Sequence, residues 1–284
     1  MLYAERSTTT QHKVPLMDLM TLLAIFCLLM VAVAFSPLGL GGGILYVPIM
    51  HYMLDWEIKE AIVASLTLVL MVSLGSSLAH SKSGFAEHQV AKWGRIAAVP
   101  SATIGVLLSG VLLTLVGDIG IKILAAIVIT FVLERTIRKP SSHIAEYTGD
   151  KLLEKRNQYL AGSSVAGIAA GVLGIGGGAI LVTLNRSMLK MDAKKAAGTS
   201  YLVAATIVPV ALLSHLVINQ NLDVIVDNSG IIAMILVPLM VFASAFFGAK
   251  YAIKYLPKQV VTVVFLFVVS ISLLRYIVDF LTVI

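Results

Sequence analysis

Apolar stretches without a single charged residue recur along this chain from one end to the other. They cover residues 19–54, 61–81, 96–117, 123–133, 157–185, 196–222, 228–249 and 259–274. A helix needs about 20 apolar residues to cross a bilayer, and most of these runs are suited to one crossing each. Only 13% of the residues are charged, whereas a soluble domain carries about 25%. We therefore expect an all-α membrane protein, folded as a polytopic helical bundle.

Two of the apolar runs are too long for a single membrane helix. Residues 19–54 make up 36 positions and residues 157–185 make up 29, and each run carries a glycine cluster part-way along. Clustered glycine breaks a helix, as does the proline that precedes the first cluster. Each long run is therefore expected to form a helix, a glycine break, and then a second, shorter helix or a re-entrant arm.

The two glycine clusters belong to an internal repeat. Gly39-Leu-Gly-Gly-Gly-Ile matches Gly174-Ile-Gly-Gly-Gly-Ala at an offset of 135 residues. Further pairs at the same offset are Lys59 with Lys194, Ala61 with Ala196, Ser65 with Ser200, and His80 with His215. Collinear matches of this kind predict that the chain is an internal duplication.

Loop charges indicate how the two halves are oriented. Residues 51–60 sum to −2, while the equivalent residues 186–195 sum to +3. If the chain reverses its direction at each glycine break, four loops on the same side of the membrane together hold 16 of the 21 Lys and Arg residues. Loops rich in Lys and Arg stay on the cytoplasmic side. Eight simple spans produce no such bias. We therefore expect two inverted repeats, with the glycine-broken helices at the midplane and both termini outside, which is an architecture of secondary transporters.

The expected organisation has four parts and no soluble domain. They are a polar N-terminal tail (1–15), a first transmembrane repeat (16–133), a charged cytoplasmic linker (134–156) and a second transmembrane repeat (157–284). The net charge of +6 comes largely from basic residues in the short loops, where such residues set membrane orientation. The lipid bilayer is therefore the expected partner, and nucleic acid is not.

This set of paired elements resembles the sulfite exporter TauE/SafE family of membrane anion transporters. The resemblance covers nearly the whole chain. It depends on the two Gly-x-Gly-Gly-Gly elements, on the helix starts that lead to Ser65 and Ser200, and on the histidines that follow. It implies transport of sulfite, thiosulfate or an organosulfonate across the cytoplasmic membrane. The first half departs from the pattern at Ala64, where the second half has Thr199.

The glycine breaks are the first candidate binding site. A helix that begins inside a membrane presents unpaired backbone N–H groups and a partial positive charge, which hold an anion without a buried lysine. The alternative is close helix packing by small residues, and the presence of two inverted clusters favours binding over it. The candidate substrate-binding glycines are Gly41, Gly42, Gly43, Gly176, Gly177 and Gly178.

Hydroxyl groups and histidines complete the candidate site. Ser65, Thr199 and Ser200 can donate to sulfonate oxygens, or they can cap the helices that follow the short loops. His80 and His215 stand at equivalent helix ends. They are either hydrogen-bonding residues at the membrane boundary or gates, because an unperturbed histidine has a pKa of about 6.5 and changes charge near neutral pH.

Several features of other protein classes are missing from the sequence. There is no phosphate-binding loop and no metal-ligand cluster, so we expect no direct use of ATP, no cofactor and no metal. The predicted function is a secondary transporter that moves a small sulfur-containing oxyanion by alternating access, with coupling to protons or other ions left open. The alternatives are an anion channel of the same fold and an intramembrane enzyme, which would need a catalytic constellation that we do not find.

Overall fold

A computed structural model describes residues 19–137, 146–219 and 222–255, with short pieces between 263 and 281. The elements within these ranges are α-helices, and no strand occurs among them. Those long and apolar enough to cross a bilayer are α3 (Ile58–Lys82), α4 (His88–Val116), α9 (Ala193–Asn219) and α11 (Ile231–Tyr255). The expected all-α membrane fold is confirmed.

Both over-long apolar runs break at their glycine clusters, as expected. The first forms α1 (Leu19–Phe35), a first break at residues 36–42, and α2 (Gly43–Met53). The second forms α7 (Arg156–Leu173), a second break at residues 174–177, and α8 (Gly178–Ser187). The remaining helices are α5 (Asp118–Ile137), α6 (Asp150–Glu154) and α10 (Leu222–Ser229). The expected N-terminal tail, residues 138–145 of the expected linker and the end of the second repeat lie outside the described residues.

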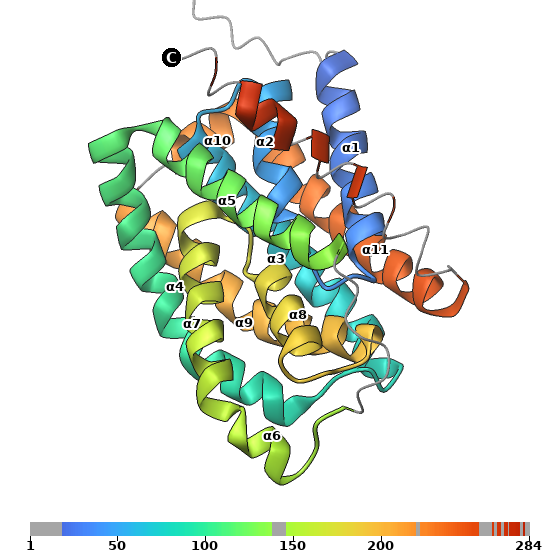
Figure 1. Ribbon diagram of the computed structural model, residues 1–284. Coiled ribbons are helices and arrows are strands. Elements are labelled where there is room, and N and C mark those ends of the chain that lie inside the picture. The colour runs from blue at the N-terminus through green and yellow to red at the C-terminus, as the bar shows by residue number, and fades with distance from the viewer. Residues whose placement is uncertain are drawn as a thin grey trace, which may run out of the picture.

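Helices α3 and α9 form the middle of the bundle and pack against each other. Helix α4 lies against α7 and α9, while α11 lies against α1 and α3 (Figure 1). The offset of 135 makes α1, α2 and α3 equivalent to α7, α8 and α9, and α4 matches α11. Each of these contacts between helices therefore has a counterpart made by the equivalent helices.

The outer helices present apolar side chains on their outer faces. Leu115 of α4 is 78% exposed and Ile232 of α11 is 80% exposed. In α3, by contrast, about two thirds of the residues in its apolar stretch are buried inside the protein. Apolar surface of this extent is stable only against lipid. The chain is a multi-pass membrane protein, with α3 enclosed by the other helices.

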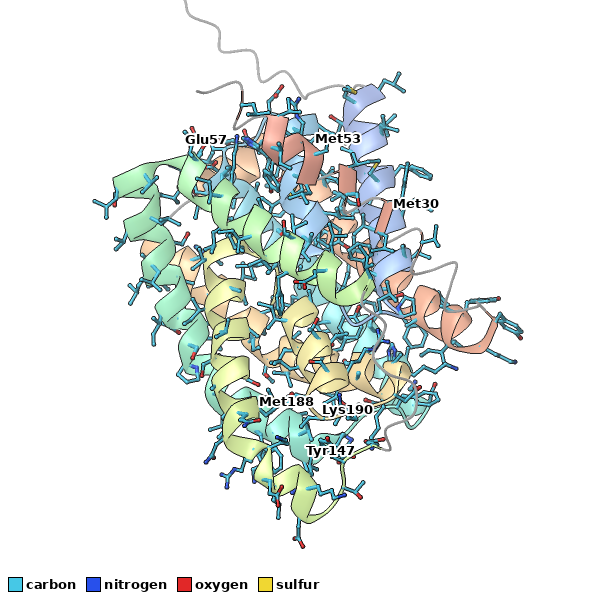
Figure 2. All side chains as sticks on the ribbon, in the orientation of Figure 1. Met30, Met53, Glu57, Tyr147, Met188 and Lys190 are labelled. Carbon is cyan, nitrogen blue, oxygen red and sulfur yellow. The ribbon has the colours of Figure 1, made fainter. Side chains whose placement is uncertain are left out.

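The two short helices after the breaks leave the centre of the molecule in opposite directions. Met53 ends α2 and lies with Glu57 at one end of the molecule, whereas Met188 and Lys190 follow α8 towards the other end (Figure 2). Their first residues, Gly43 and Gly178, contact the opposite breaks. Helices α2 and α8 therefore begin near one another and diverge.

Candidate functional site

The two glycine breaks touch each other through backbone atoms. A Cβ added at Gly43 would lie 2.7 Å from the carbonyl oxygen of Gly174, and one added at Gly178 would lie 2.7 Å from the carbonyl oxygen of Gly39. These contacts are equivalent, because residues 43 and 178 and residues 39 and 174 are pairs at the offset of 135. Gly43 and Gly178 thus pack closely, since only glycine leaves room for the facing backbone, and binding of an anion by their amides stays a prediction.

Each break is held by one serine hydroxyl from the opposite half of the chain. The Ser65 hydroxyl donates to the carbonyl oxygen of Gly174 at 2.9 Å, and the Ser200 hydroxyl donates to that of Gly39 at 2.8 Å. Each bond is the counterpart of the other at the offset of 135. Both hydroxyl hydrogens are therefore engaged with the backbone, and direct binding of an anion by these serines stays a prediction.

The capping alternative for these hydroxyls is wrong, because the helices begin earlier than the sequence indicated. Helix α3 starts at Ile58, and α9 starts at Ala193, where Asp192 accepts the backbone N–H of Lys194 at 2.9 Å. Ser65 and Ser200 thus lie about two turns inside their helices. Thr199 instead accepts the backbone N–H of Glu87 at 2.9 Å, which attaches the start of α4 to α9.

Left-handed backbone explains why other glycines stand in the breaks. Gly41, Gly42, Gly176 and Gly177 have φ values between 71° and 88°, a region that other residues enter only with strain. The environments of Gly42 and Gly177 differ, however. A Cβ at Gly177 would meet the Ala166 backbone oxygen at 2.7 Å, while the atoms nearest to one at Gly42 belong to the Tyr46 side chain. Binding of an anion by these amides stays a prediction.

Both candidate gating histidines are buried inside the bundle. His80 is 0% exposed and donates from Nδ1 to the Ser76 carbonyl oxygen at 2.9 Å. His215 is 1% exposed and donates from Nε2 to the Gly171 carbonyl oxygen at 2.7 Å. Both therefore make hydrogen bonds to backbone carbonyl oxygens, and a role as hydrogen-bonding residues at the membrane boundary stays a prediction. Their role as gates stays a prediction.

His80 belongs to a group of buried polar residues beside the first break, whose other members sequence reasoning missed. We call this group the polar cluster: Tyr46, Ser73, Ser76, His80 and Tyr201. The Tyr201 hydroxyl donates to the Phe35 carbonyl oxygen at 2.7 Å and accepts the Gly41 N–H at 3.5 Å. Its ring lies 5.8 Å from that of His80, the Ser76 hydroxyl lies near it, and the Tyr46 hydroxyl lies beside Gly42 of the same break. The cluster connects the break to one face of α3.

A signal for this cluster was present in the repeat. At the offset of 135, four of its residues correspond to apolar ones. The equivalents of Tyr46, Ser73, Ser76 and Tyr201 are Leu181, Val208, Ala211 and Leu66. Matches between the halves reveal the shared backbone contacts, whereas the pairs in which one half is polar and the other apolar indicate where the halves differ.

Ion pairs join the loops at one end of the bundle. Lys195 of α9 binds Glu87 at 2.9 Å and Glu146 at 2.7 Å. The adjacent Lys194 donates from Nζ to the carbonyl oxygen of Ile253 in α11 at 2.8 Å, and Gly198 touches the backbone of Phe85. The loop between α3 and α4 is thereby held across the first turns of α9, near His80.

The fold and this central contact define a multi-pass helical membrane protein built around two broken helices. The family model for the sulfite exporter TauE/SafE matches residues 23–276, so the chain belongs to that family, and it is a membrane transporter. A curated relative from Methanocaldococcus jannaschii is described as a probable membrane transporter protein. It is 25% identical over 240 residues, covering 79% of this chain and 83% of the relative. No solved structure matches the chain. The resemblance inferred from the sequence is confirmed.

Proposed function

We propose that the protein is a secondary transporter of the cytoplasmic membrane, which moves a small sulfur-containing oxyanion such as sulfite, thiosulfate or an organosulfonate. The observation that carries this proposal is the meeting of the two glycine breaks inside the bundle. There the N-termini of α2 and α8 lie against the opposite break. The first amides of a helix have no partner within it and carry partial positive charge. Such half-helix N-termini bind anionic substrate groups in other transporters.

An inverted repeat is part of the proposal. Three observations support it: the reciprocal bonds of Ser65 and Ser200, the equivalent contacts of Gly43 and Gly178, and the opposite directions of α2 and α8. In an inverted repeat a movement that opens one side has a counterpart that opens the other. Alternating access around a fixed central site follows from this relation.

Transport can be tested in proteoliposomes that contain the purified protein. Vesicles loaded with unlabelled sulfite should accumulate external ³⁵S-sulfite transiently above equilibrium, because a carrier exchanges substrate while a channel does not. Thiosulfate, methanesulfonate and chloride serve as competitors, and we expect the first two to inhibit and chloride not to. Uptake that never saturates and shows no counterflow would favour the anion channel instead.

The proposed orientation can be tested by labelling single cysteines after Cys27 is replaced. Glu57 and Lys151 are exposed and belong to loops for which opposite sides are expected. A membrane-impermeant maleimide should label Glu57→Cys in intact cells and Lys151→Cys only after lysis. Labelling of Lys151→Cys from outside would contradict the expected cytoplasmic linker and, with it, the inverted repeat.

A further inference from the structure

We propose that the transported oxyanion binds on one side of the central contact, in the polar cluster beside the first break, and that the second break does not bind it. This inference rests on the proposed function and assigns its substrate site. The donors are the hydroxyls of Tyr46, Ser76 and Ser73 together with the first amides of α2.

The unpaired hydroxyls of the polar cluster are the first argument. Tyr46, Ser73 and Ser76 are each buried. The hydroxyls of Tyr46 and Ser73 have no hydrogen-bond partner within the described residues, and the Ser76 hydroxyl has only the Tyr201 hydroxyl beside it. A buried polar group without a partner destabilises the folded state, so such hydroxyls gathered beside one break are hard to explain by stability. A ligand that accepts hydrogen bonds would satisfy them.

Their position at a helix N-terminus is the second argument. A Cβ added at Gly42 would lie 3.0 Å from the Tyr46 hydroxyl, which shows that the phenol folds back over the start of α2. Ser73, Ser76 and His80 share one face of α3 because they are three and four residues apart. The Tyr201 hydroxyl joins the two groups, since it accepts the Gly41 N–H and lies near Ser76. Hydroxyl and amide donors thus converge.

The ring of His80 gives this site a side-chain hydrogen-bond acceptor, the Nε2 atom. A carbonyl oxygen only accepts, so the bond to Ser76 places the hydrogen of the neutral ring on Nδ1. The buried Nε2 has no partner within the described residues. An oxyanion beside it therefore binds together with one proton, carried by the anion or by the imidazole. The titratable and charged groups that face His80 are the Tyr201 phenol and the Lys194 ammonium, both on α9.

The second break lacks these groups although its backbone is equivalent. Leu181 stands where Tyr46 stands in the first half, and Val208 and Ala211 replace the two serines. A Cβ at Gly41 or at Gly176 would meet Val69, but at Gly176 it would also meet Val208, which stands where the first half has Ser73. An anion there would lose its water without gaining hydroxyl donors, which is unfavourable.

The experiment removes one hydroxyl of the cluster at a time. Equilibrium binding of ³⁵S-sulfite to the purified full chain is measured for Tyr46→Phe and for Ser76→Ala, the second of which introduces the residue that the other half carries. Matched controls are Tyr159→Phe and Ser109→Ala, whose hydroxyls are also buried and unpaired but belong to α7 and α4. Each cluster variant should raise the Kd about tenfold, the effect of one lost hydrogen bond to a charged group, while the controls keep the parental Kd.

The outcomes separate this inference from the proposed function. If the unmodified protein shows counterflow but Tyr46→Phe and Ser76→Ala keep its Kd, the assignment to the polar cluster is wrong and transport stands. The assignment is also wrong if the control variants weaken binding as much. If the unmodified protein neither binds nor exchanges sulfite, thiosulfate or methanesulfonate, the proposed function fails first and this inference falls with it. A thermal melt of each variant shows that the folded state is retained.

Discussion

The first break and the second break are held by equivalent backbone contacts but have different side chains around them. In both, a serine of the other half donates to a glycine carbonyl, and the helix that follows begins with a glycine against the facing break. Around the first break lie two tyrosines and two serines, whereas aliphatic side chains and one alanine occupy the equivalent positions of the second. The equivalence therefore extends to the backbone and not to the chemistry.

This difference shows which positions of a duplicated scaffold are free to change. Gly43 and Gly178 face backbone atoms that cannot move aside, so any side chain at either position collides. Tyr46 and Leu181, by contrast, extend from the first turn of their helices and differ in chemistry. Steric constraint keeps the halves alike at the contact, and the proposed binding site needs only one of them to be polar.

The largest effect is expected where the breaks touch. Gly43→Ala and Gly178→Ala should each abolish folded protein, because overpacking against backbone costs about 1–3 kcal/mol or more. Gly110→Ala is the control, since a Cβ there meets nothing within 4 Å. Yield of monodisperse protein in detergent is the measurement. Normal yield for one variant and loss for the other would break the equivalence of the two contacts.

The next effect distinguishes Gly42 from Gly177. Alanine at either position adopts a left-handed conformation at a cost of about 1–2 kcal/mol. At Gly177 it also meets the Ala166 backbone, whereas at Gly42 it displaces the Tyr46 ring. Gly177→Ala should therefore lose folding, and Gly42→Ala should insert but lose transport. Uptake per folded molecule decides, and normal uptake by Gly42→Ala would remove the tight site at the start of α2.

A smaller and equal effect is expected from Ser65→Ala and Ser200→Ala. Each change leaves a buried glycine carbonyl without its hydroxyl donor, at a cost of about 1–3 kcal/mol. Ser101→Ala is the control, since that hydroxyl bonds to its own helix at Ala97. Thermal unfolding in detergent should fall alike for both variants. Weaker sulfite binding with unchanged stability would instead show that these serines are ligands.

The smallest effect concerns the two histidines. His80 lies in the polar cluster, with Tyr201 and Lys194 as its ionisable neighbours, whereas the equivalents of the cluster near His215 are apolar. We expect His80→Gln to flatten the pH dependence of uptake between about pH 5 and 8, and His215→Gln to change it less. Initial rates over this range, with substrate added on either side, are the measurement. Unchanged profiles in both variants would exclude the gating role.

Much of the architecture was predictable because hydrophobicity and glycine act locally. The apolar runs became α3, α4, α9 and α11, and both over-long runs broke where glycine and proline stood. The helix starts were less predictable. Helix α3 begins seven residues before Ser65, and in the sequence a serine inside a helix looks the same as a serine that caps it. Helices α6 and α10 were not expected either, because short helices have no apolar run to indicate them.

What the sequence by itself determined is the solvent, the breaks and the duplication. A chain with so few charges has to use lipid as its solvent, and a glycine-rich segment cannot continue a membrane helix. Only the tertiary structure decided which residues meet. The serines of each half bond to the break of the other half across more than 100 residues of chain, and Tyr201 of α9 bonds to the backbone of Phe35 and Gly41 at the first break. Contacts between distant segments depend on packing geometry, which no local pattern encodes.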